Sequence, residues 1–149
     1  MLRSRRFFLG SLVAMAAVLA GGSIAQAGAG EGKLRANLTG TADARGATGR
    51  ADYRPARTEV EKGKKKTKPA EIKVEVQKLG LPVGTALDVI LDPAQGPDVK
   101  LGTLRVNKGG VAKFESTTTA IAAAGDVVKV VTQGAAPKVL LSGAFRPHQ

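Results

Sequence analysis

The sequence predicts an all-β fold: an antiparallel β-sandwich of about seven to eight short strands, with a small β-barrel as the alternative. Three observations predict it. Short segments alternate apolar and polar residues with a period of two, and turn residues separate them roughly every 8 to 12 residues. No segment keeps a helical period over three turns. A chain of 149 residues is the size of one domain.

Eight segments carry the strand pattern, and residues 71–77 carry it most clearly. There Ile72, Val74 and Val76 alternate with charged and amide side chains, which predicts one buried and one exposed face. The expected strands are residues 33–38, 47–54, 71–77, 87–91, 99–106, 111–116, 126–132 and 138–145. Residues 107–110 (NKGG) are expected to close a tight hairpin, because Asn and Gly adopt positive φ readily. The alanines of residues 119–124 are the one indication of a helical turn.

Four short segments resemble small exported bacterial domains of the immunoglobulin-like type. They are residues 38–42 (LTGTA), 49–53 (GRADY), 74–76 (VEV) and 139–145 (VLLSGAF). The resemblance is limited to the general residue pattern of the strands. It implies an immunoglobulin-like arrangement of the sandwich and transfers no functional residue.

Residues 1–27 have the pattern of a cleavable export signal. Arginines open the segment, and an apolar run follows at residues 7–20. This run is shorter than the roughly 20 apolar residues that a membrane span needs, so no transmembrane segment is expected. Small side chains at Ala25 and Ala27 predict cleavage after Ala27 by a signal peptidase.

The residues Ser4, Arg5, Arg6, Phe7, Phe8 and Leu9 closely resemble the twin-arginine signal motif S-R-R-x-F-L-K, with Gly10 in the place of the lysine. The resemblance implies export by the twin-arginine machinery and a periplasmic or extracellular location in a bacterium. A general secretory signal is the alternative. The expected organisation after the signal is a flexible tail at 28–32, a single β domain at 33–146 and a C-terminal tail at 147–149.

Composition excludes several classes of chemistry. The chain has no cysteine, which rules out disulfides, thiolate nucleophiles and cysteine-based metal sites. The single histidine, His148, lies in the expected C-terminal tail, and no serine lies in a nucleophile motif. We therefore expect no enzyme, no cofactor and no metal. The alternative for a metal is Ca²⁺ near Asp88, Asp92 and Asp98, although their spacing matches no known calcium loop.

The most unusual segment is the lysine-rich stretch at residues 61–69, expected to be a solvated loop because dense like charges repel one another. It either keeps the domain soluble and blunts a strand edge, or it binds anionic polymers such as wall polymers, lipopolysaccharide or nucleic acid. The candidate polyanion-binding residues are Lys62, Lys64, Lys65, Lys66, Lys68, Arg50, Arg54 and Arg57.

The arginines of this set have an alternative role. Arg50 and Arg54 are expected to share one face of a strand, where arginines commonly pair with carboxylates such as Asp43, Asp52 or Glu59. Aromatic residues make up only 3% of the chain, so no base-stacking or specific recognition of nucleic acid is expected.

The last feature of the sequence is its strongly positive net charge. The formal net charge is +11, which makes acidic surfaces the natural electrostatic partners. The sequence thus predicts an exported, non-enzymatic domain with a structural or protein-interaction role in the envelope or outside the cell. The alternative is an electrostatic polyanion-binding module.

Overall fold

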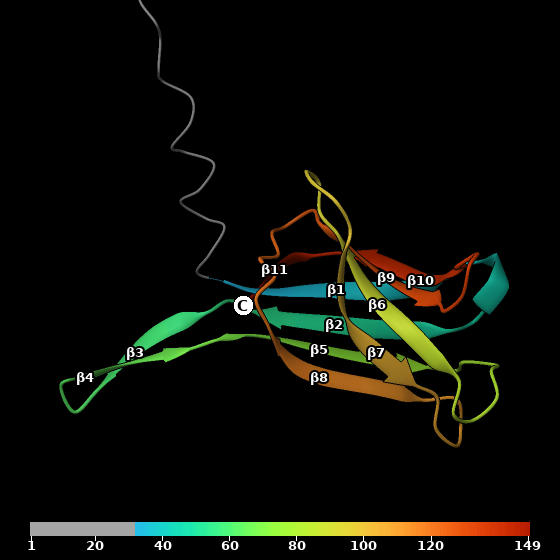
Figure 1. The fold of residues 1–149 in the computed structure, drawn as a ribbon, viewed down its shortest axis with the longest axis horizontal. Helices are drawn as coiled ribbons and strands as arrows, with labels where there is room; N and C mark the ends of the chain where they lie inside the picture. Colours follow the sequence, from blue (N-terminus) through green and yellow to red (C-terminus); the bar gives the residue numbers. More distant parts are fainter. Residues whose placement is uncertain (1–31) are drawn as a thin grey trace, which may run out of the picture.

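The computed structural model describes residues 32–149, and it is all-β, as the sequence predicts (Figure 1). The export signal predicted at residues 1–27, with its arginine motif and its cleavage site, lies outside the described residues, as do residues 28–31 of the predicted tail. Among the described residues the only helix is a single 3-10 turn, η2 (Ala42–Ala44). No helix in this part of the chain is long and apolar enough to cross a membrane.

Eleven strands make up the described chain. They are β1 (Lys33–Gly40), β2 (Thr48–Arg54), β3 (Arg57–Glu61), β4 (Lys64–Lys68), β5 (Ala70–Gln77), β6 (Ala86–Asp92), β7 (Val99–Arg105), β8 (Ala112–Thr118), β9 (Val127–Thr132), β10 (Val139–Ala144) and β11 (Arg146–His148). The eight segments expected from the alternation pattern are all strands, and β3, β4 and β11 are additional.

One antiparallel sheet contains most of these strands, in the order β7-β6-β9-β10-β1-β2-β5-β8, with β11 pairing with β1 beside β10. The sheet curls until its two end strands, β7 and β8, come into contact without pairing. At that seam the Phe114 ring packs so closely on Gly102 that a Cβ there would overlap the ring. The fold is therefore a nearly closed barrel-like sheet, and Figure 1 shows β6 and β7 crossing over β2 and β5 as in a two-layered sandwich.

The inner face of the curled sheet forms one apolar core. Alternate residues of each strand enter it, as Leu34, Ala36 and Leu38 do on β1. The aromatic rings of Tyr53 and Phe145 pack in it with centroids 6.1 Å apart. The Tyr53 hydroxyl donates a hydrogen bond to the Ala120 carbonyl, 3.1 Å away. The alternation places the intervening charged residues on the outer face, where they are available for contacts with solvent or partners.

Three local expectations are wrong. Residues 61–69 are largely not a loop: β4 pairs with β3 in a β-hairpin, because Lys62 and Gly63 both take positive φ and close a two-residue turn. Residues 147–149 are not a free tail, because β11 pairs with the start of β1, with Lys33 opposite His148. Residues 119–124 form no helical turn; the buried Ala122 is held instead in an irregular connection that packs on the core.

Candidate polyanion-binding hairpin

The β3–β4 hairpin projects from the body of the domain as a two-stranded ribbon (Figure 1). It pairs only with itself, with Glu61 opposite Lys64 next to the turn and Arg57 opposite Lys68 at the base. The turn residues have φ values of 51° at Lys62 and 76° at Gly63, which correspond to a type I′ turn. This turn suits the right-handed twist of the strands, and it explains how a lysine-rich sequence with low β propensity still forms a hairpin.

The hairpin sorts its lysines onto two faces. Because side chains alternate along a strand, Lys64, Lys66 and Lys68 share one face with Arg57, whereas Lys65 lies on the opposite face with Val60. Successive lysines on the first face are about 7 Å apart along the strand. We call this face, formed by Arg57, Lys64, Lys66 and Lys68 with Glu59 and Glu61, the cationic face. A polymer lying along it meets three lysines in a row.

A carboxylate at the base of the hairpin fixes two of these cations. Glu59 accepts hydrogen bonds from Arg57 Nε and Lys68 Nζ, each at 2.7 Å. The bonds from Lys68 and Arg57 lower the pKa of Glu59 to about 2. The same Glu59 bond raises the pKa of Arg57. All three side chains are partly exposed, so solvent screens the pairs and their contribution to stability is small. Within the described chain, the other hairpin lysines, Lys62, Lys64, Lys65 and Lys66, have no ion-pair partner.

Arg50 and Arg54 lie on the outer face of β2, as predicted, and they are not part of the hairpin. They belong to a sheet face on which cross-strand partners have opposite charges. Arg50 lies opposite Glu75 and Arg54 opposite Glu71. Arg50 Nε also contacts Asp52 Oδ2 at 2.9 Å. The expected pairing is confirmed for Arg50 with Asp52 and for Arg57 with Glu59, whereas no ion pair among the described residues includes Arg54 or Asp43. Of the candidate arginines only Arg57 belongs to the hairpin.

The same charge pattern continues across the outer face toward β8. Lys73 lies opposite both Asp52 and Glu115, and Glu75 lies opposite Lys113. The corresponding ion pairs measure 3.8 Å for Lys73–Glu115 and 3.5 Å for Lys113–Glu75. Bonds from Gln77 and Lys113 lower the pKa of Glu75. This part of the surface is close to electrically neutral, in contrast to the hairpin.

Two of the three aspartates considered for Ca²⁺, Asp88 and Asp92, form ion pairs with lysines. Asp88 contacts Lys100 Nζ at 3.0 Å and accepts a 2.8 Å bond from Gln133, which lowers its pKa. Asp92 contacts Lys129 Nζ at 2.5 Å, and this bond lowers the pKa of the carboxyl group. Among residues 32–149 no three carboxylate or imidazole groups lie close enough together to hold a metal ion.

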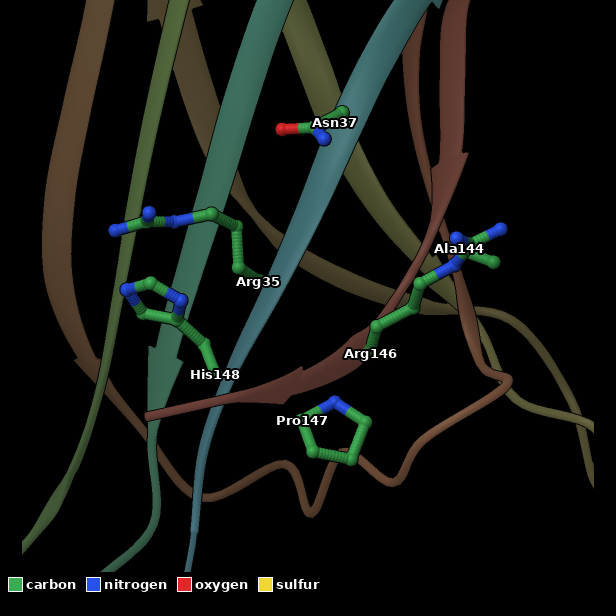
Figure 2. A pocket seen from close by; sticks show the side chains of 6 residues that line it. All are labelled: Arg35, Asn37, Ala144, Arg146, Pro147 and His148. Carbon is green, nitrogen blue, oxygen red and sulfur yellow. The ribbon is translucent and has the colours of Figure 1, made fainter.

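A second basic cluster, which sequence reasoning missed, lies on β1 and β11. The strand register places Arg35 opposite Arg146 and Lys33 opposite His148. A hollow of about 350 Å³ lies beside them. It is lined by the side chains shown in Figure 2: Arg35, Asn37, Ala144, Arg146, Pro147 and His148. The sequence does contain a signal: two basic residues are spaced two apart at each end of the domain, Lys33 and Arg35 at one end and Arg146 and His148 at the other. Only the pairing of β1 with β11 brings the two ends together.

No family model matches the sequence, and no curated protein is significantly similar to it.

Proposed function

We propose that this protein is a non-enzymatic binding domain whose β3–β4 hairpin holds anionic polymers by electrostatic contact. One observation carries the proposal: residues 57–68 combine six basic and two acidic side chains on a ribbon that projects from the body. One of the two carboxylates, Glu59, is already shared by Arg57 and Lys68. The remaining lysines face solvent, where they can replace the counterions of a phosphate-rich chain.

The contrast with the rest of the surface supports this choice. The outer face of β2, β5 and β8 pairs its cations with carboxylates one by one, as a face does when its charges serve solubility and strand register. The cationic face of the hairpin also has two cross-strand pairs of opposite charge, Glu59 with Lys66 and Glu61 with Lys64, but its four cations outnumber its two carboxylates. The export signal predicted at residues 1–27 would place the hairpin among the anionic polymers of a bacterial envelope.

Binding of this kind is not sequence-specific. The hairpin holds no aromatic side chain, so it offers no platform on which a base or a sugar ring could stack. Affinity must then come from phosphate or carboxylate charges along the polymer, and it must fall steeply as salt rises. Polymers of similar charge density should bind alike, whatever their monomers.

A binding measurement with a fluorescent single-stranded oligothymidine tests the proposal. The full chain is compared with its triple variant Lys64→Gln, Lys65→Gln, Lys66→Gln, and with Lys108→Gln, which removes an exposed charge far from the hairpin. Two lost contacts on the cationic face should weaken binding about 25-fold at 0.1 M salt, at about 0.7 log units per contact. Lys108→Gln should bind like the parent.

The arginines of the predicted export signal are present in all three proteins, so differences in affinity among them report on the substituted lysines. Equal affinity of the parent and the triple variant would refute the proposal. The hairpin would then be a solubilising projection, and the domain's role would be the structural or protein-interaction one.

A further inference from the structure

The charge pattern of the main sheet has one exception, at the pairing of β1 with β11. Elsewhere on the outer face, cross-strand partners attract: Arg35 faces Asp52 on β2, for example. On its other side Arg35 faces Arg146, and Lys33 faces His148. Like charges directly opposite each other across two strands are destabilising. A sheet that otherwise alternates its charges therefore keeps a basic corner at a cost in stability.

The hairpin shows how the fold accommodates such a pair when no ligand is involved. Among the register pairs of the described residues, the other place where two fully charged cations face each other is Arg57 opposite Lys68. There Glu59 lies between them and accepts a bond from each. The Arg35–Arg146 pair has no such carboxylate: none of the six described residues that line the hollow is acidic. The position on β1 that corresponds to Glu59, two residues after the arginine, holds the neutral side chain of Asn37.

Groups with hydrogen-bond donors lie on more than one side of the hollow. In Figure 2 the Arg35 guanidinium and the His148 imidazole lie on one side, Arg146 extends away from them on the other side, and the Asn37 amide lies above them. Asp52 accepts from Arg35 Nε at 2.7 Å, but it also accepts from Arg50 Nε at 2.9 Å, so one carboxylate serves two guanidinium groups. The terminal nitrogens of Arg35 keep donors for another acceptor.

We propose that the hollow beside the paired strands β1 and β11 is a binding site for a phosphate group. Arg35 and Arg146 supply the charge, because guanidinium groups match the geometry of phosphate oxygens. Asn37 and His148 supply further hydrogen bonds. The volume of about 350 Å³ leaves room for more than the phosphate itself, so the group is carried either as free phosphate or as a phosphate ester. This site shares no residue with the hairpin, and it stands independently of the proposed function.

The test follows the Arg Nε–H and His side-chain NMR signals of the full chain as inorganic phosphate replaces chloride at constant pH and ionic strength. Saturable shifts at Arg35, Arg146 and His148 are expected. Methyl phosphate is the second probe: equal affinity assigns recognition to the oxyanion alone, and tighter binding assigns part of it to the ester side of the hollow. Both results support the site. Shifts that are linear in phosphate and spread over all arginines would overturn it.

Two variants separate a binding site from a structural feature. Arg146→Gln should weaken phosphate binding about tenfold or more, because it removes a charged hydrogen bond to the ligand. In chloride alone the same variant should have an unchanged or higher Tm, because it removes the repulsion of Arg35. Arg45→Gln, an exposed charge in the turn after η2, is the matched control and should bind phosphate normally. A clear fall in the Tm of Arg146→Gln in chloride, or undiminished binding by it, would overturn the proposal.

Discussion

Asp126 is predicted to anchor one end of the barrel, and Asp126→Ala should destabilise the domain by about 3 kcal/mol. Among residues 32–149 it is the only buried charged residue, with 5% of its surface exposed. Its carboxylate accepts a bond from the Ala94 backbone N–H at 3.0 Å and another from the Ala123 N–H at 2.8 Å. Alanine removes both charge-assisted bonds, each of which contributes roughly 1.5–3 kcal/mol.

Thermal and urea unfolding followed by circular dichroism measure this loss. A domain of this size loses about 4 °C of Tm per kcal/mol, so the variant should melt about 12 °C lower. Asp43→Ala is the matched control, because Asp43 is exposed in the η2 turn, and its effect should stay within about 0.5 kcal/mol. The reasoning would be refuted if Asp126→Ala lost less than about 1 kcal/mol or no more than Asp43→Ala.

Three further predictions concern particular residues. Gly143→Ala should lower the free energy of unfolding in urea by about 2 kcal/mol, because its Cβ would overlap the Asn37 carbonyl oxygen. Gly80→Ala is the control and should be nearly neutral, because there is open space around Gly80. Equal effects of the two substitutions would contradict this prediction. Glu59 should titrate by NMR with a pKa of about 2. Its ion pairs with Arg57 and Lys68 should therefore stabilise the base of the hairpin at any pH above its ordinary pKa and be lost as the pH falls toward 2. An ordinary pKa would show that the two ion pairs do not form in solution. Lys62→Asn should slow amide exchange in β3 and β4, because Asn-Gly suits a type I′ turn better than Lys-Gly; faster exchange would argue against this turn.

The sequence predicts the strands of the barrel well, because their alternation records one buried and one exposed face. It fails for β4, since five closely spaced lysines indicate a loop and only the turn geometry at Lys62 and Gly63 brings the strand back onto β3. It fails for β11, because a three-residue strand containing Pro147 has no periodicity of its own and exists through pairing with β1.

The sequence predicts which residues form the candidate site but not how they are arranged. It identifies the lysines and Arg57, but their division between two faces depends on the hairpin register. Arg35 and Arg146 become neighbours only when the two ends of the domain pair, which no local pattern indicates. In the sequence Asp126 is only the first residue of an expected strand. Its carboxylate binds the backbone N–H groups of Ala94 and Ala123, which lie in two separate connections, so no local pattern indicates its role.

The salt dependence of oligothymidine binding tests the central claim most directly, since it counts the contacts that the hairpin makes. A strand lying along the cationic face engages Lys64 and Lys66, the two lysines of that face that Glu59 does not hold, which predicts a slope of log K against log salt of about −1.4, at about −0.7 per contact. Lys66→Gln should flatten the slope to about −0.7. Lys65→Gln, which removes the same charge from the opposite face, should leave the slope near −1.4. A slope near zero in the parent, or equal flattening by the two variants, would contradict binding on the cationic face.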